Sequence, residues 1–156
     1  MPKQSAGILL YRIKDHQPQF FIVHPGGPFF KNKDAGVWSI PKGEFENGED
    51  ILAAAEREFT EETGQAINGE FTALEPVKLK SGKKIYAFAV EGEVDESKVI
   101  SNTFPFEWPP RSGKTIMIPE VDKGDWFDAD TAKLKLNPGQ IALIDNLLQI
   151  LSGRLS

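Results

Sequence analysis

The sequence predicts a mixed α/β sandwich. Short apolar segments rich in aromatic and β-branched residues come first, followed by a helical segment, further strands and a C-terminal helix, which is the order typical of that class. The chain has 156 residues, of which 40% are hydrophobic and 26% are charged, as in ordinary globular proteins. We therefore expect one domain over residues 1–156.

The N-terminal part is predicted to form three strands. Residues 5–12 and 19–24 are short and apolar, and the stretch Lys14–Pro18 between them is expected to be a hairpin loop. Pro25–Pro28 then breaks the chain. A short strand is expected over residues 37–41.

The central part is predicted to contain a helix and a hairpin. The helix covers Glu49–Thr63, and Gly64 is a plausible stop. Residues 70–80 and 83–91 are expected to pair around Ser81-Gly82.

The C-terminal part is predicted to end in a strand and a helix. Asp125–Asp128 is expected to end a strand, and Asn137-Pro138 supplies a helix N-cap followed by proline, with the helix continuing to about Leu151. Residues 101–114 are expected to form a long irregular stretch. Such stretches inside compact domains are often functional loops.

Composition excludes several kinds of chemistry. The chain has no cysteine, which excludes disulfides, thiol catalysis and Cys-ligated metals, and His16 and His24 are too few for a His-rich zinc site. No apolar run is long enough to span a bilayer, and no secretory signal is visible, so the cytoplasm is the expected location. A net charge of −5 argues against stable nucleic-acid binding.

The acidic residues of the predicted helix suggest a metal site. On a helix, Glu62 lies about 40° from Glu58, and Glu61 lies about 60° away on the other side. Like charges at this spacing, close to a helix C-terminus, are unfavourable, and such violations often mark functional sites. A divalent cation such as Mg²⁺ or Mn²⁺ would remove the cost. A solvated acidic helix face is the alternative.

The spacing of these residues resembles the Nudix box, G-x5-E-x7-R-E-U-x-E-E-x-G-U. Its specified glycine and polar positions are filled by Gly43, Glu49, Arg57, Glu58, Glu61, Glu62 and Gly64. Phe59 fills the first apolar position, whereas Gln65 departs from the pattern at the last one. The lead-in Trp38–Gly43 is similar to that of the diadenosine-polyphosphate-hydrolase-like branch. The resemblance implies a Nudix-type α/β/α sandwich with a mixed β-sheet.

The resemblance also implies a metal-dependent pyrophosphohydrolase. Glu58 and Glu62 would be metal ligands, Glu61 would be a further ligand or act through water, and the carbonyl near Lys42 or Gly43 could complete the coordination. Cations of this kind, Mg²⁺ or Mn²⁺, shield phosphate charge and activate water.

The remaining box residues would position the acids, and a further acid would serve as the base. Arg57 would orient glutamates, and Glu49 would have an orienting role at the start of the helix. The general base is a box glutamate or a later loop acid. Glu120 is the best loop candidate, ahead of Glu107 and Asp122, and an exposed loop acid is the alternative.

Substrate contacts are expected from residues outside the helix. Lys42 is a candidate phosphate contact, and Arg111 in the irregular stretch is a candidate for distal phosphates. Aromatic residues near the expected loops could stack on a base, although such residues more often belong to a core; they are Phe29, Phe30, Trp38 and Trp108. His24 is expected to be structural.

The resemblance leaves several functions open. Dinucleoside polyphosphates are the first substrate class, followed by nucleoside triphosphates and ADP-sugars. A non-catalytic nucleotide-binding Nudix module is the alternative from another class. The expected partner is a nucleotide polyphosphate substrate, with no membrane partner, and a homodimer is an open possibility.

Overall fold

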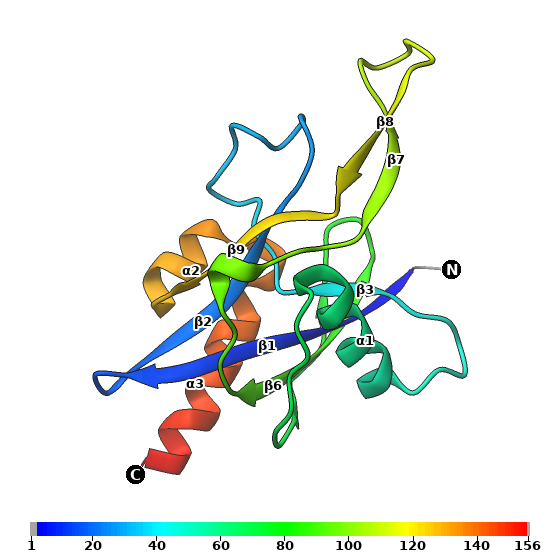
Figure 1. Cartoon of the computed structure of the whole chain (residues 1–156). Helices are drawn as coiled ribbons and strands as arrows, with labels where there is room; N and C mark the ends of the chain where they lie inside the picture. Colours follow the sequence, from blue (N-terminus) through cyan, green and yellow to red (C-terminus); the bar gives the residue numbers. More distant parts are fainter. Residues whose placement is uncertain (1–2, 156) are drawn as a thin grey trace.

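The structure, a computed structural model, describes residues 3–155. Residues 1–2 and 156, the ends of the predicted domain, lie outside the described residues. The fold is a mixed seven-stranded sheet with helices on both faces and a two-stranded arm that projects from it (Figure 1). The predicted mixed α/β sandwich is confirmed.

The sheet has the strand order β4-β6-β1-β2-β9, with β3 paired to β1 and β5 paired to β6. Its strands are β1 (Gln4–Lys14), β2 (Gln17–Pro25), β3 (Lys42–Glu44), β4 (Thr72–Ala73), β5 (Val77–Lys78), β6 (Lys84–Glu91) and β9 (Val121–Phe127). The arm consists of β7 (Thr103–Glu107) and β8 (Thr115–Pro119). The helices are α1 (Ile51–Thr63), α2 (Ala129–Lys135) and α3 (Ile141–Leu155), with short 3₁₀ turns η1 (Glu96–Lys98) and η2 (Pro138–Gln140).

Two hydrophobic cores lie on opposite faces of the sheet, because side chains alternate along its central strand. Ile8 and Leu10 of β1 pack in the core that contains Phe59 of α1. Leu9, between them, packs in the core that contains Leu143 of α3. The sheet thereby holds α1, the predicted chemical helix, against one face.

The predicted N-terminal hairpin is confirmed with a tighter turn than expected. β1 and β2 pair antiparallel up to Lys14 and Gln17. Asp15 and His16 form the two-residue turn with φ of 52° and 65°, the positive φ that such hairpin turns require. The predicted cap of the last helix is also confirmed, since the Asn137 side chain accepts a hydrogen bond from the N–H of Gly139 at 3.0 Å.

Several predicted boundaries were wrong. Residues 37–41 form only isolated bridges, Ser39 with Val23 and Trp38 with Leu136, because Pro41 ends the segment before a ladder develops. The first strand of the 70–80 hairpin is interrupted at Pro76, which lies between β4 and β5. The acidic helix begins at Ile51, not Glu49.

The C-terminal helical region and the irregular stretch also differ from the prediction. The C-terminal helix is preceded by η2 and by α2, which the sequence analysis missed because it has only seven residues. Residues 101–114 are not irregular, because Thr103–Glu107 pairs with Thr115–Pro119 as the arm.

Among residues 3–155, no helix is both long enough and apolar enough to cross a membrane.

Candidate active site

Three carboxylates meet beside the N-terminal strands. Glu58 and Glu62 come from α1, and Glu120 comes from the junction of β8 and β9. One oxygen of each lies within 4.8 Å of those of the other two. Glu58 and Glu62 are buried, and Glu120 is half-buried. The sequence placed the first two on one helix face and named Glu120 as the best loop candidate for the base, and the fold brings Glu120 beside them.

The ends of α1 fix the helix that carries the acids. The Asp50 side chain accepts a hydrogen bond from the N–H of Ala53 at 2.9 Å and caps the first turn. Gly64 ends the helix with φ of 75°, and its N–H donates to the Thr60 carbonyl at 2.8 Å. Phe59 is fully buried against the sheet. Its burial sets the rotation of the helix and directs Glu58 and Glu62 along β3.

The backbone of β3 approaches both buried acids. A Cβ added at Gly43 would overlap the Glu58 carboxylate, so only glycine permits this approach. The backbone N–H of Lys42 donates to Glu62 Oε1 at 3.1 Å. The close contact between Gly43 and the Glu58 carboxylate explains in physical terms why glycine begins the box.

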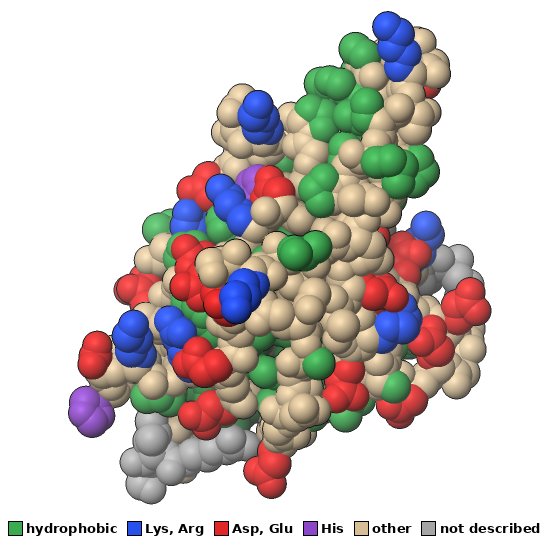
Figure 2. All heavy atoms as spheres, in the orientation of Figure 1, with side chains coloured by type: hydrophobic (Ala, Val, Ile, Leu, Met, Phe, Trp, Pro, Cys, Tyr) green, Lys and Arg blue, Asp and Glu red, His purple; other side chains and the backbone are tan. Residues whose placement is uncertain are grey.

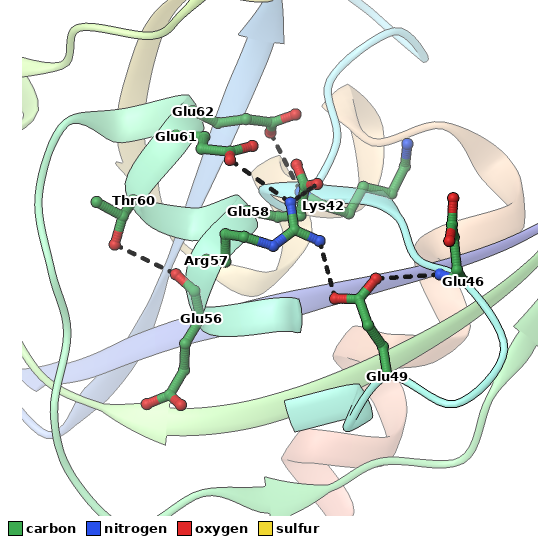
Figure 3. Close-up of polar contacts among 9 residues, drawn as sticks. All are labelled: Lys42, Glu46, Glu49, Glu56, Arg57, Glu58, Thr60, Glu61 and Glu62. Atoms are coloured by element: carbon green, nitrogen blue, oxygen red, sulfur yellow. Dashed lines mark hydrogen bonds and ion pairs between the residues drawn. The ribbon is translucent and has the colours of Figure 1, made fainter. Parts of the chain in front are cut away.

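Arg57 connects the carboxylates around it (Figure 3). Its guanidinium lies 2.9 Å from Glu58 Oε1, 3.5 Å from Glu61 Oε1 and 3.2 Å from Glu49 Oε2. Glu49 in turn accepts a hydrogen bond from the N–H of Glu46 at 3.1 Å. Arg57 and Glu49 therefore belong to one network with the acids, with Glu49 before the helix and not within it.

Burial makes the negatively charged forms of the clustered carboxylates unfavourable. Burial raises the pKa of Glu62 to about 8, although the hydrogen bond from Lys42 and its positive charge act in the opposite direction. Burial and the neighbouring Glu61 raise the pKa of Glu58, and Arg57 opposes them. Carboxylates held in this way favour any positive charge that enters between them.

Lys42 lies close to the acids and is half-buried. Burial and the charge of Lys83 lower the pKa of the Lys42 ammonium. Lys83 lies 3.5 Å from Glu44 Oε1. Lys83 was not among the predicted site residues. No local signal could have shown its position, because it depends on β1 holding β3 and β6 together.

A small cleft opens onto the cluster. It has a volume of about 120 Å³, and its lining includes Lys42, Glu62, Glu120, Pro25 and Ser39. An anion entering this cleft would meet carboxylates, so it needs a cation to accompany it. The carboxylate oxygens are the ligands that Mg²⁺ and Mn²⁺ prefer, and the donor set therefore fits a hard divalent cation.

Other predicted residues lie at the margin of the site or away from it. Glu61 lies outside the group of three, with its side chain 37% exposed and directed to Arg57. Trp38 lies in the core, 3% exposed, with its indole N–H donating to Asp34 at 2.7 Å. Arg111 lies in the turn at the tip of the arm.

His24 is buried and satisfied, as expected of a structural histidine. Its Nδ1 lies 2.9 Å from Asp122 Oδ1, and its Nε2 lies 2.7 Å from the Lys33 carbonyl. These contacts tie the loop after β2 to the start of β9.

The comparisons with known proteins agree with this geometry. The NUDIX domain model matches residues 1–147. The chain is a hydrolase of the class that acts on anhydrides in phosphorus-containing substrates. It belongs to the Nudix family.

Solved structures with the same fold share little sequence with this chain. A Caenorhabditis elegans Ap4A hydrolase in a binary complex is 18% identical with a TM-score of 0.63, covering 96% of this chain and 98% of that one. The NUDIX domain of Shewanella oneidensis NrtR, complexed with ADP ribose, is 17% identical with a TM-score of 0.65, covering 97% and 89%. A comparison with curated proteins found no significant match.

Proposed function

We propose that the protein is a metal-dependent pyrophosphohydrolase that cleaves a phosphoanhydride bond in a nucleoside diphosphate linked to a further group. The observation that carries this proposal is the group of three carboxylates, from two separate parts of the chain, beside Lys42. Dinucleoside polyphosphates are the first substrate class. Nucleoside triphosphates and ADP-sugars are the alternatives.

In this proposal Glu58 and Glu62 hold a divalent cation, Mg²⁺ or Mn²⁺. Glu61 contacts the same cation through a water molecule. The cation supplies positive charge to the phosphate oxygens and activates water. The carbonyl of Gly43 is a further candidate ligand, since this residue already lies against the Glu58 carboxylate. Arg57 keeps the acids oriented.

Glu120 is proposed as the general base, because it is the least buried of the three acids. Water attacks one phosphorus of the anhydride, and Glu120 accepts the proton that the water loses. The new bond joins the water oxygen to phosphorus, and the bond from that phosphorus to the bridging oxygen breaks. The second phosphate leaves with the bridging oxygen. No nucleophile from the protein is needed.

A larger cavity beside β3 is proposed to receive the first nucleoside of the substrate. It has a volume of about 600 Å³, and Phe45 and Val77 lie among the residues that line it. Lys3 and Lys84 supply positive charge at its margin. Glu44, which also lines it, follows Gly43 directly in β3. Phe45 and Val77 suit contact with a base, and the lysines suit contact with its phosphates.

The proposal is tested by a product-resolved screen of nucleotides with Mg²⁺ and with Mn²⁺. Wild type should release phosphate-containing products only with metal, and Glu62→Gln should reduce turnover at least 100-fold. Glu56→Gln is the matched control, since Glu56 is on the same helix and points away from the cluster (Figure 3). Equal loss in both variants, or turnover close to wild type in Glu62→Gln, would contradict the assignment.

A further inference from the structure

A second, apolar recess lies on the other side of the acidic cluster. We call it the arm groove. It lies between the loop that follows β2 and the arm, with a volume of about 120 Å³, and its main apolar lining is Phe29, Phe30, Phe104, Phe106 and Ile118. Figure 2 shows hydrophobic side chains gathered along the projecting arm at the top of the view. Such a surface is costly in water unless something covers it.

The aromatic residues of the arm groove present open ring surfaces. Phe29 is 55% exposed and meets Phe30 edge-on, with their centroids 4.9 Å apart. Phe104 is 36% exposed and meets Phe106 edge-on at 6.3 Å. These pairs hold the rings in place while leaving area free on each side of the groove. Planar aromatic ligands bind to such surfaces by stacking.

A positive charge lies at the margin of the arm groove. The Lys33 ammonium lies 3.6 Å from the centroid of the Phe29 ring. The groove therefore combines aromatic surface with an adjacent cation. Nucleotides offer the complementary pair, an aromatic base joined to anionic phosphate.

The arm groove lies next to the catalytic cleft. Ile118 lies in β8, two residues before Glu120, which follows the end of that strand. Gly26 packs against Pro119, and its N–H donates to the Glu120 carbonyl at 3.1 Å. The 600 Å³ cavity lies in another part of the fold, beside β3, where Glu44 lines it. Of the two recesses, the arm groove is the one joined to the acidic cluster by a direct contact, that of Gly26 with Glu120.

We infer that the arm groove binds the second base of a dinucleoside polyphosphate whose phosphate bridge lies over the acidic cluster. This inference rests on the proposed function and narrows its substrate class. A mononucleotide fills only the cavity beside β3, whereas a dinucleoside substrate also reaches Phe29 and Phe104. The arm is then a specificity element of the enzyme.

The test compares diadenosine tetraphosphate with ATP as substrates of the full chain. Phe104→Ala should lower kcat/KM for the dinucleoside about tenfold, mainly through KM, and leave the value for ATP unchanged. Phe104→Leu keeps an apolar side chain but removes the ring, and it should show the same selective loss. Ile13→Ala is the matched control. Ile13 is also an exposed apolar side chain, 44% exposed, but it lies at the C-terminal end of β1, away from the arm (Figure 1).

A second readout does not depend on turnover. Calorimetric titration of the slow variant Glu62→Gln with Mg²⁺ present should show tighter binding of diadenosine tetraphosphate than of ATP, and adding Phe104→Ala should remove that difference. Equal losses for both nucleotides, or no loss, would overturn the inference and leave the proposed function standing. A wild-type dimer that Phe104→Ala dissociates would instead make the groove an interface between copies. Absence of any nucleotide cleavage would overturn the proposed function itself.

Discussion

Replacing Glu62 with glutamine should stabilise the metal-free protein while abolishing its activity. The Glu62 carboxylate is buried, and its pKa is raised to about 8 by that burial. Glutamine has the same shape and keeps an oxygen for the N–H of Lys42, which lies 3.1 Å from Glu62 Oε1. The substitution therefore removes the buried negative charge and leaves the packing unchanged.

The sign and size of the effect follow from the pKa of Glu62. The folded protein holds the Glu62 proton more tightly than the unfolded chain, so the free energy of unfolding falls as pH rises from about 4.5 to about 8. At about 1.4 kcal/mol per pH unit, the full penalty above pH 8 is at most about 5 kcal/mol. Because Lys42 lies nearby and the site relaxes, we expect a gain of about 2–4 kcal/mol for Glu62→Gln.

The measurement is urea unfolding in EDTA at pH 5 and at pH 8.5. Wild type and Glu62→Gln should have similar free energies of unfolding at pH 5, and the variant should be more stable at pH 8.5. Glu61→Gln is the control, because the Glu61 side chain is 37% exposed and should change stability little. If Glu62→Gln is no more stable than wild type at pH 8.5, the account of the buried charge is wrong.

Three further predictions concern the residues around the acids. Gly43→Ala should cost about 1–3 kcal/mol in urea unfolding and most of the activity, because its Cβ would overlap the Glu58 carboxylate, whereas Gly153→Ala, in open space on α3, should be neutral or stabilising. Arg57→Lys should lower kcat about tenfold, because lysine cannot hold three carboxylates with a planar fork, and an unchanged kcat would refute an orienting role. Lys42→Ala should raise KM for longer polyphosphates more than for diphosphates; equal increases in a chain-length series would exclude a phosphate contact.

The fold could be predicted where the local pattern and the tertiary structure agree. The first hairpin, α1 and the Asn137 cap follow from apolar periodicity and capping residues, which act over a few neighbours. The arm was missed because Pro105 and the Trp108-Pro109-Pro110 run suggest a loop. An isolated two-stranded ribbon tolerates proline, since one edge of each strand has no partner. The alternation of Phe104 and Phe106 was the available signal.

The geometry of the site could be predicted only within one helix, although Glu120 was named as a candidate acid from its place in a later loop. The spacing of Glu58 and Glu62 is a local property, so the sequence indicates it directly. The approach of Glu120 depends on the arm returning the chain to β9, and the approach of Lys83 depends on sheet order. Trp38 shows the converse, because its position near an expected loop suggested stacking on a base, whereas the structure buries it in the core.

The acidic cluster links the stability of the protein to its chemistry. Burial makes the ionised Glu62 unfavourable in the free protein, and the same burial keeps water away from the charge that a cation would meet. Cation binding must displace the Glu62 proton, so cation affinity should rise with pH over the range in which metal-free stability falls. A ligand that binds only the folded state stabilises it in proportion to the logarithm of its concentration. Mg²⁺ should therefore raise the midpoint temperature of thermal unfolding more at pH 8.5 than at pH 5. An equal rise at both pH values would show that Glu62 is not a ligand of the cation.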